Sequence, residues 1–328
     1  MKKFVKTALL IAVICCVLGG ALLVIGLGNG GLAELSKTDI NSSTGTVSNT
    51  KKHTLEKEKL PEFTGIEADL SYADFKIIPS EDDSCYLSYA IYDNKKSEPI
   101  YYEVKNNILH LKESETSGSF FQIDYSSILH MGRQSTDNFE NSVTLYLPAE
   151  KLLESAAIAL DSGDCSMDSF QTKQLDLEMN YGDLNIKDST INQVKLSLGD
   201  GDMQANHLTM TNPDITVSYG ELNLTDSTLQ NAVIQLSDGD FNADRTTFLG
   251  QTTGQLEYGD ASINLTEEQK ASLGLQLSTD YGEISVSQGI TGALSAQDNE
   301  DYQRFERAGS NPEETFTLRN SDGDITLR

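Results

Sequence analysis

The sequence predicts an all-β domain of stacked repeats of about 19 residues with two strands each, preceded by one N-terminal transmembrane helix. Three observations support this prediction. The chain opens with basic residues and a long apolar run, a Gly followed by a carboxylate recurs at a fixed interval, and apolar residues alternate in the same register in successive repeats.

The N-terminal segment has the length and the charge of a membrane anchor. Lys2, Lys3 and Lys6 precede 20 residues, 8–27, without a charged or strongly polar side chain. A helix of about 20 apolar residues crosses the hydrocarbon core of a bilayer. Basic flanks stay on the cytoplasmic side, so we expect a cytoplasmic tail at 1–7, a transmembrane anchor at 8–28 and an extracellular C-terminal domain on the cell membrane.

Two other interpretations of this segment stay open. A cleaved signal peptide has an apolar region of about 7–15 residues before a small-residue site, which is shorter than the run found here. Cys15 and Cys16 suggest a lipoprotein, but Ile14 stands before the first cysteine, where processing needs a small residue. An uncleaved anchor therefore agrees best with the sequence.

Residues 29–60 are predicted to form a flexible stalk between the membrane and the domain. The stretch 36–59 is rich in Ser, Thr, Asn and Lys and has no hydrophobic periodicity. Such a composition is typical of a linker.

The region 61–328 is the predicted β-repeat domain. Its repeat glycines are spaced first by 19 residues and then by longer steps; they are Gly163, Gly182, Gly201, Gly220, Gly239, Gly259, Gly282 and Gly323. An earlier copy has Ala73 in the place of the Gly. We expect regular repeats at about 154–288, a charged insertion at about 289–314 and a last repeat at 315–328.

Apolar residues alternate on both sides of each repeat Gly, which predicts two half-buried strands per repeat. Five residues before the Gly stand Leu177, Leu196, Ile215 and Ile234. We expect these four side chains to be buried and stacked on one face. Identical registers favour a β-solenoid, in which like positions stack on like, over the alternative of an antiparallel meander or sandwich.

The segments 143–148 (VTLYLP) and 158–164 (IALDSGD), followed by the Gly-Asp repeats, resemble the putative-adhesin family of β-strand-repeat proteins. This family is a domain of unknown function common in Gram-positive bacteria. The resemblance covers residues 63–328. It implies a right-handed β-solenoid-like fold on the outer face of the cell membrane, and it supplies no catalytic residues.

The charge of the chain limits the classes of partner that it can bind. The net charge is −26, and because residues 1–60 carry eight Lys and four acidic residues, the remainder is about −30. Nucleic acid is excluded as a partner, since phosphate contacts need Lys and Arg. An unknown protein or glycan ligand of the envelope, a cationic peptide or a metal ion agrees with this charge, and so does an acidity that serves solubility alone.

The carboxylate after each repeat Gly raises the question of calcium. Asp164, Asp202 and Asp240 are weak metal candidates, but neither a nine-residue calcium repeat nor a 12-residue EF-hand loop is present. We expect one outward-pointing column of carboxylates that accept hydrogen bonds from turn N–H groups and bind cations at most weakly. Its members are Asp164, Asp183, Asp202, Glu221, Asp240 and Asp260.

No catalytic motif stands out, so we expect neither an enzyme nor a cofactor. The four histidines are not at a metal-binding spacing; they are His53, His110, His130 and His207. Cys85 and Cys165 are the cysteines outside the apolar run, and a disulfide between them is an open alternative. Two functions remain: a surface binding or adhesion module, or a structural or regulatory cell-envelope stress-response protein without direct adhesive role.

Overall fold

The computed structural model describes residues 51–93, 98–114, 141–296 and 302–328. All of these except Lys51 belong to one compact unit, Lys52–Arg328. The predicted anchor at 8–28 and the stalk before residue 51 lie outside the described residues. Among the described residues, we find no helical segment with the length and hydrophobicity of a bilayer-spanning helix.

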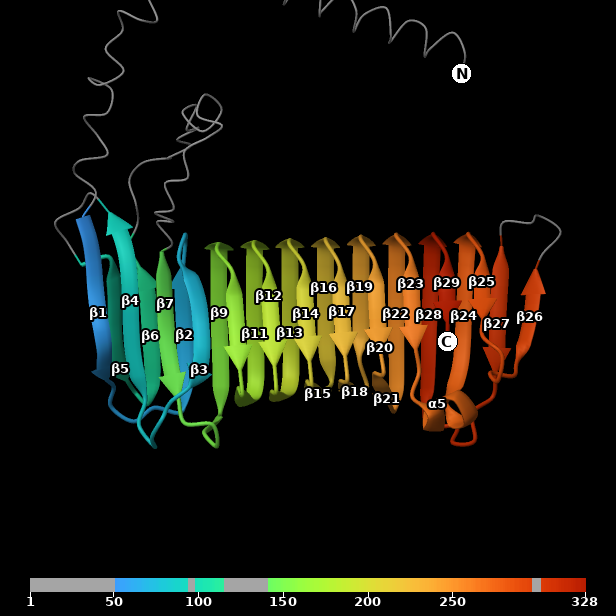
Figure 1. Ribbon diagram of the computed structural model, residues 1–328, viewed down its shortest axis with the longest axis horizontal. Helices are drawn as coiled ribbons and strands as arrows, with labels where there is room; N and C mark the ends of the chain where they lie inside the picture. Colours follow the sequence, from blue (N-terminus) through green and yellow to red (C-terminus); the bar gives the residue numbers. More distant parts are fainter. Residues whose placement is uncertain (1–50, 94–97, 115–140, 297–301) are drawn as a thin grey trace, which may run out of the picture. The chain divides into compact units, whose positions relative to one another are not determined.

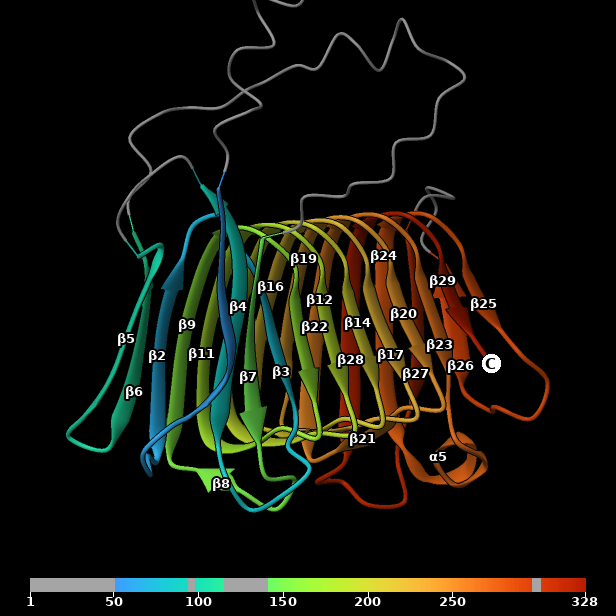
Figure 2. The same cartoon turned by 60° about the vertical axis from the view of Figure 1, so that its left-hand side comes forward.

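The described part of the chain is nearly all β, and its strands form two sheets that face each other across the core (Figures 1 and 2). Sheet A has the spatial order β1 (Lys51–Lys59), β4 (Tyr86–Asp93), β7 (Ser142–Leu147), β3 (Asp74–Pro79), β10 (Cys165–Asp168), β12 (Leu184–Lys187), β14 (Met203–Asn206), β17 (Leu222–Thr225), β20 (Phe241–Asp244), β23 (Ala261–Asn264), β29 (Ile325–Leu327) and β25 (Ile284–Val286).

Sheet B contains the remaining strands. In chain order they are β2 (Gly65–Leu70), β5 (Ile100–Lys105), β6 (Ile108–Glu113), β8 (Leu152–Leu153), β9 (Ser155–Ser162), β11 (Gln171–Tyr181), β13 (Thr190–Asp200), β15 (Thr209–Thr211), β16 (Pro213–Tyr219), β18 (Thr228–Gln230), β19 (Val233–Asp238), β21 (Thr247–Leu249), β22 (Gln251–Tyr258), β24 (Gly274–Tyr281), β26 (Ala293–Ala296), β27 (Gln303–Arg307) and β28 (Thr315–Asp322). The helix α5 (Glu267–Ser272) precedes β24.

Each repeat forms one coil, with a strand in sheet B, a tight turn and a strand in sheet A. Corresponding strands of successive coils pair in parallel with the 19-residue register. Leu177, Leu196, Ile215 and Ile234 are therefore direct neighbours, and all four are buried. Parallel pairing through the middle of the stack supports the solenoid interpretation over the antiparallel one, while the right-handed winding stays a prediction.

For two coils, the position in the stack differs from the position in the sequence. The β2–β3 coil pairs with β6 and β7 on one side and with β9 and β10 on the other. Likewise β28 lies between β22 and β24, and β29 lies between β23 and β25 (Figure 1). Phe316 stacks on Phe248 with ring centroids 4.5 Å apart, and Leu318 fills the space over Gly254, where a Cβ would lie 2.6 Å from Leu318 Cδ1.

The ends of the stack differ from the predicted boundaries. Residues 51–59, which we expected to belong to the stalk, form β1 at the edge of sheet A. Leu55 packs against the core there, while lysines flank it, as is common on edge strands. The insertion 289–314 contains β26 and β27, which extend sheet B by antiparallel pairing onto β24. Both segments lack the apolar alternation on which the prediction depended.

Two buried polar side chains replace missing backbone partners. The Glu113 carboxylate accepts hydrogen bonds from the N–H groups of Ser71 (2.7 Å), Tyr72 (2.8 Å) and Ala73 (3.3 Å). The Gln269 amide of α5 donates to the Phe248 carbonyl (2.7 Å) and accepts from the Phe248 N–H (3.2 Å). These bonds satisfy backbone groups that have no backbone partner among the described residues.

The two described cysteines are free and buried, so the open alternative of a Cys85–Cys165 disulfide is not realised. Burial raises the pKa of the Cys165 thiol to about 12 and also raises the pKa of Cys85. Both side chains serve as small core residues.

Candidate functional site

The turns that lead from sheet B to sheet A form one edge of the stack, the upper edge in Figure 1, which we call the turn edge. All eight repeat glycines lie here. Gly239 shows why glycine is needed: its φ is +148°, and a Cβ would lie 1.9 Å from the carbonyl oxygen of Gly220. The close stacking of coils therefore leaves no room for a side chain at Gly239.

The carboxylates that follow the glycines hold the turns of neighbouring coils together. Each accepts a hydrogen bond from the N–H of the acidic residue in the next coil, as in Asp183 N–H to Asp164 (2.9 Å) and Asp202 N–H to Asp183 (3.0 Å). The accepting side chains are Asp74, Asp164, Asp183, Asp202, Asp240, Asp260 and Asp324. We call this row the carboxylate ladder.

Glu221 interrupts the ladder. Its carboxylate accepts from the Asn223 side chain at 3.2 Å, and in the described structure the Asp240 N–H has no carboxylate partner. The extra methylene of Glu moves its oxygens away from the next turn. The weak metal candidates Asp164, Asp202 and Asp240 each use one oxygen in the ladder, and the described residues contain no group of three His, Cys, Asp or Glu side chains that could hold a metal ion.

A second row on the turn edge, one residue before each Gly, has a different character. Strand pairing places tyrosine and aspartate alternately in the order Tyr181, Asp200, Tyr219, Asp238, Tyr258, Asp322 and Tyr281. We call this row the Tyr–Asp column. Its alternation depends on the displaced β28, because Tyr258 and Tyr281 are successive in the sequence and Asp322 separates them in space.

The side chains of the Tyr–Asp column are free. Tyr181, Tyr219, Tyr258 and Tyr281 are 59%, 61%, 58% and 64% exposed. Within the described ranges, no hydrogen bond or ion pair involves their hydroxyls or the carboxylates of Asp200, Asp238 and Asp322. A shallow hollow of about 400 Å³ opens beside Tyr219, between Asp200 and Asp238. Because the ladder already supplies the bonds between turns, this column has no evident structural task.

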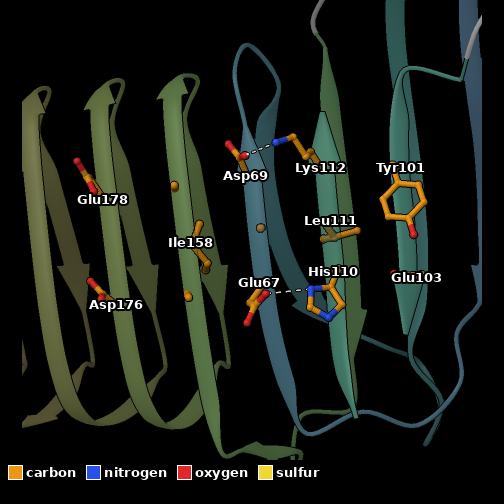
Figure 3. A pocket seen from close by; sticks show the side chains of 13 residues that line it. Glu67, Asp69, Tyr101, Glu103, His110, Leu111, Lys112, Ile158, Asp176 and Glu178 are labelled. Atoms are coloured by element: carbon orange, nitrogen blue, oxygen red, sulfur yellow. Dashed lines mark ion pairs between the residues drawn. The ribbon is translucent and has the colours of Figure 1, made fainter. Parts of the chain in front are cut away.

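A groove on the outer face of sheet B is a second concave surface (Figure 3). It has a volume of about 520 Å³, and the exposed Ala157 and Ala159 of β9 lie at its floor. Pairing places Ala157 between Glu67 and Asp176, and it places Ala159 between the next pair of carboxylates, Asp69 and Glu178. Small side chains between acidic rows leave the groove open.

The two acidic sides of this groove differ. On the β2 side His110 Nδ1 lies 2.9 Å from Glu67, and Lys112 Nζ lies 3.2 Å from Asp69 (Figure 3). On the β11 side, Asp176 and Glu178 have no ion pair within the described part of the chain. The groove therefore suits a positively charged group.

Sequence reasoning identified the turn glycines and the ladder, but it missed the column and the groove. The alternation of Tyr-Gly and Asp-Gly is visible at Gly182, Gly201, Gly220 and Gly239, and it would have predicted the column. The groove depends on which coils are neighbours. Of the histidines, His110 pairs with Glu67 and His207 lies 3.6 Å from Asp188, whereas His130 lies outside the described residues.

Several solved structures match most of the chain at low sequence identity. A putative cell adhesion protein from Clostridium sporogenes is 12% identical, with 85% of this chain and 98% of that chain covered and a TM-score of 0.30. A putative lipid binding protein from Parabacteroides distasonis is 14% identical over 85% and 97%, with a TM-score of 0.43. A putative adhesin from Parabacteroides merdae is 15% identical over 85% and 97%, with a TM-score of 0.44.

No curated protein matches the chain. A family model described as Toastrack DUF4097 matches residues 63–328, the same range over which the sequence resembles the putative-adhesin family. Since this match covers most of the chain, the protein belongs to the Toastrack DUF4097 family.

Proposed function

We propose that this protein is a non-enzymatic surface binding module, held on the outer face of the cell membrane by its N-terminal apolar run. The observation that supports the proposal is the Tyr–Asp column, a regular row of exposed tyrosines whose polar groups have no partner in the described chain. Tyrosine is enriched in protein interfaces, since it offers a large contact area and a hydroxyl at low conformational cost. Exposed apolar surface that is gathered in one place marks interaction sites, whereas single scattered residues need no such explanation.

The charge of the domain favours the same interpretation. The column and the ladder place two rows of carboxylates on one edge, and five more line the groove on sheet B. A partner that is cationic would be attracted over a distance comparable with the Debye length, about 8 Å at physiological salt. The partner we propose is a protein or glycan of the cell envelope.

Retention of envelope components tests the proposal. Full-length protein is immobilised and incubated with solubilised cell envelope, and the bound material is compared between the wild type, the Tyr219→Ser/Tyr258→Ser double variant and the Tyr101→Ser variant. Tyr101 is 52% exposed but lies at the groove. We expect the double variant to lose most of the bound material and Tyr101→Ser to keep it.

Retention that depends on neither surface contradicts the binding proposal. It would favour the alternative, a structural or regulatory envelope protein without direct adhesive role. Loss in Tyr101→Ser alone would move the binding surface from the column to the groove.

A further inference from the structure

The spacing of the Tyr–Asp column is set by the fold. Neighbouring strands are about 4.8 Å apart, so tyrosines on every second coil recur about every 9.6 Å. A polyproline II helix has three residues per turn and rises about 3.1 Å per residue, so it repeats about every 9.3 Å. Over the three intervals from Tyr181 to Tyr281, the two repeats drift apart by only about 1 Å.

Other peptide conformations do not match this repeat. An extended strand places side chains on one face about every 6.8 Å. An α-helix repeats about every 5.4 Å. A strand is about 2.8 Å out of register after one interval. Two helical turns span about 10.8 Å, so a helix drifts from the column by about 3.6 Å over the three intervals, and the spacing therefore favours the polyproline II helix.

The chemistry of the column selects the charge of the ligand. Asp200 stands between Tyr181 and Tyr219, and Asp238 and Asp322 stand in the same way between the following tyrosines. A cation over such an aspartate would gain from the free carboxylate and from the flanking ring faces. The hollow beside Tyr219 offers room for one such group.

We propose that the Tyr–Asp column binds an extended cationic peptide in the polyproline II conformation. A Lys or Arg at every third residue lies over Asp200, Asp238 and Asp322, and proline or other apolar residues pack on the tyrosines. Aromatic platforms for polyproline II ligands are a general mode of recognition, because the ligand loses little entropy on binding. This inference rests on the proposed surface-binding function and names the class of its partner.

A pair of peptides of identical composition tests the register. The matched peptide is acetyl-(Lys-Pro-Pro)₄-amide, and its isomer carries the same four lysines at every second position followed by the remaining prolines. Binding to the full-length protein, with detergent in every buffer, is measured by fluorescence anisotropy at low and at physiological salt. We expect the matched peptide to bind about tenfold more tightly than the isomer and to weaken with salt.

Variants then locate the site. We expect Tyr219→Ser/Tyr258→Ser and Asp200→Asn/Asp238→Asn each to weaken the matched peptide about tenfold and to leave the isomer unaffected. Leu152→Ser, at an exposed position of β8 outside the column and the groove, should leave both peptides unchanged. Thermal melts verify that the variants fold. Equal binding of the two peptides, no binding of either, or a loss in Leu152→Ser alone overturns the inference. The envelope experiment separates the two failures: if retention there still depends on the column, the proposed function stands and only the class of partner is wrong.

Discussion

The Glu113 side chain accepts hydrogen bonds from three backbone N–H groups at the turn between β2 and β3. Among the described residues, no backbone carbonyl accepts from the N–H groups of Ser71, Tyr72 and Ala73. The Glu113 carboxylate takes this role and lies buried, with only 5% of its surface exposed. Hydrogen bonds from buried N–H groups to a charged acceptor are costly to leave unmade.

We therefore expect Glu113→Ala to lower the free energy of unfolding by about 2–4 kcal/mol. Denaturant titration measures this change. Glu257→Ala, at an exposed position of β22, should change it by no more than about 0.5 kcal/mol. If Glu113→Ala lowered the free energy of unfolding as little as Glu257→Ala does, water would be replacing the carboxylate as acceptor for the three N–H groups.

Because Cys165 is buried, we expect the free energy of unfolding to depend on pH in the alkaline range. Burial raises the pKa of its thiol from 9.0 to about 12, so the thiol stays neutral in the folded protein at a pH where the unfolded chain ionises. A group whose pKa is raised by folding stabilises the protein below the unfolded pKa and loses this contribution as the pH rises. We expect the free energy of unfolding to fall between pH 9 and pH 12, and to fall less steeply in Cys165→Ala. If the free energy of unfolding fell equally steeply with pH in the wild type and in Cys165→Ala, the raised pKa of Cys165 would be contradicted.

At the scale of the element, the sequence predicts the coils better than their order. Alternation and the 19-residue Gly spacing are local patterns, so the buried column through Leu177 and Leu196 and the turn glycines could be predicted. The order of coils could not, because every coil offers its neighbours the same register. Side chains such as Phe316 against Phe248, and Leu318 over Gly254, distinguish the neighbours, and such pairs are visible only in three dimensions.

The candidate site also has one feature that the sequence predicts and two that depend on the order of the coils. The ladder was predicted because a carboxylate follows each Gly, although its acceptors bond to the next coil and not to their own turn. The Tyr–Asp column and the groove over Ala157 and Ala159 depend on neighbours in space. The strand β1 was missed because it is rich in lysine and has no apolar alternation, although Leu55 packs against the core.

The ladder predicts a weak response to calcium. Each accepting carboxylate is already bonded to an N–H group at 2.8–3.0 Å, so a cation would have to compete with that bond. We expect millimolar calcium, compared with chelator at matched ionic strength, to shift the melting temperature by no more than about 2 °C. A rise of many degrees with calcium but not with sodium would show that the ladder is a cation site.

At the scale of the whole molecule, the charge and the apolar N-terminus predict an exposed domain. The basic residues Lys2, Lys3 and Lys6 precede the run at 8–27, and the acidic domain follows it. We expect protease added to intact cells or protoplasts to release the domain, while a cytoplasmic marker stays intact. Full protection of the domain would contradict this topology.

The displaced coil β28–β29 has a consequence for the time course of folding. It lies inside the stack, between coils that are synthesised before it. While the ribosome is still making residues 315–328, β24 and β25 cannot take their final place, and β22 and β23 present open edges. The stack can therefore grow coil by coil only as far as β23, after which its completion waits for the last described strands. A nascent chain held short of that point would expose unpaired parallel edges. Such edges can pair with other chains and aggregate unless chaperones bind them first.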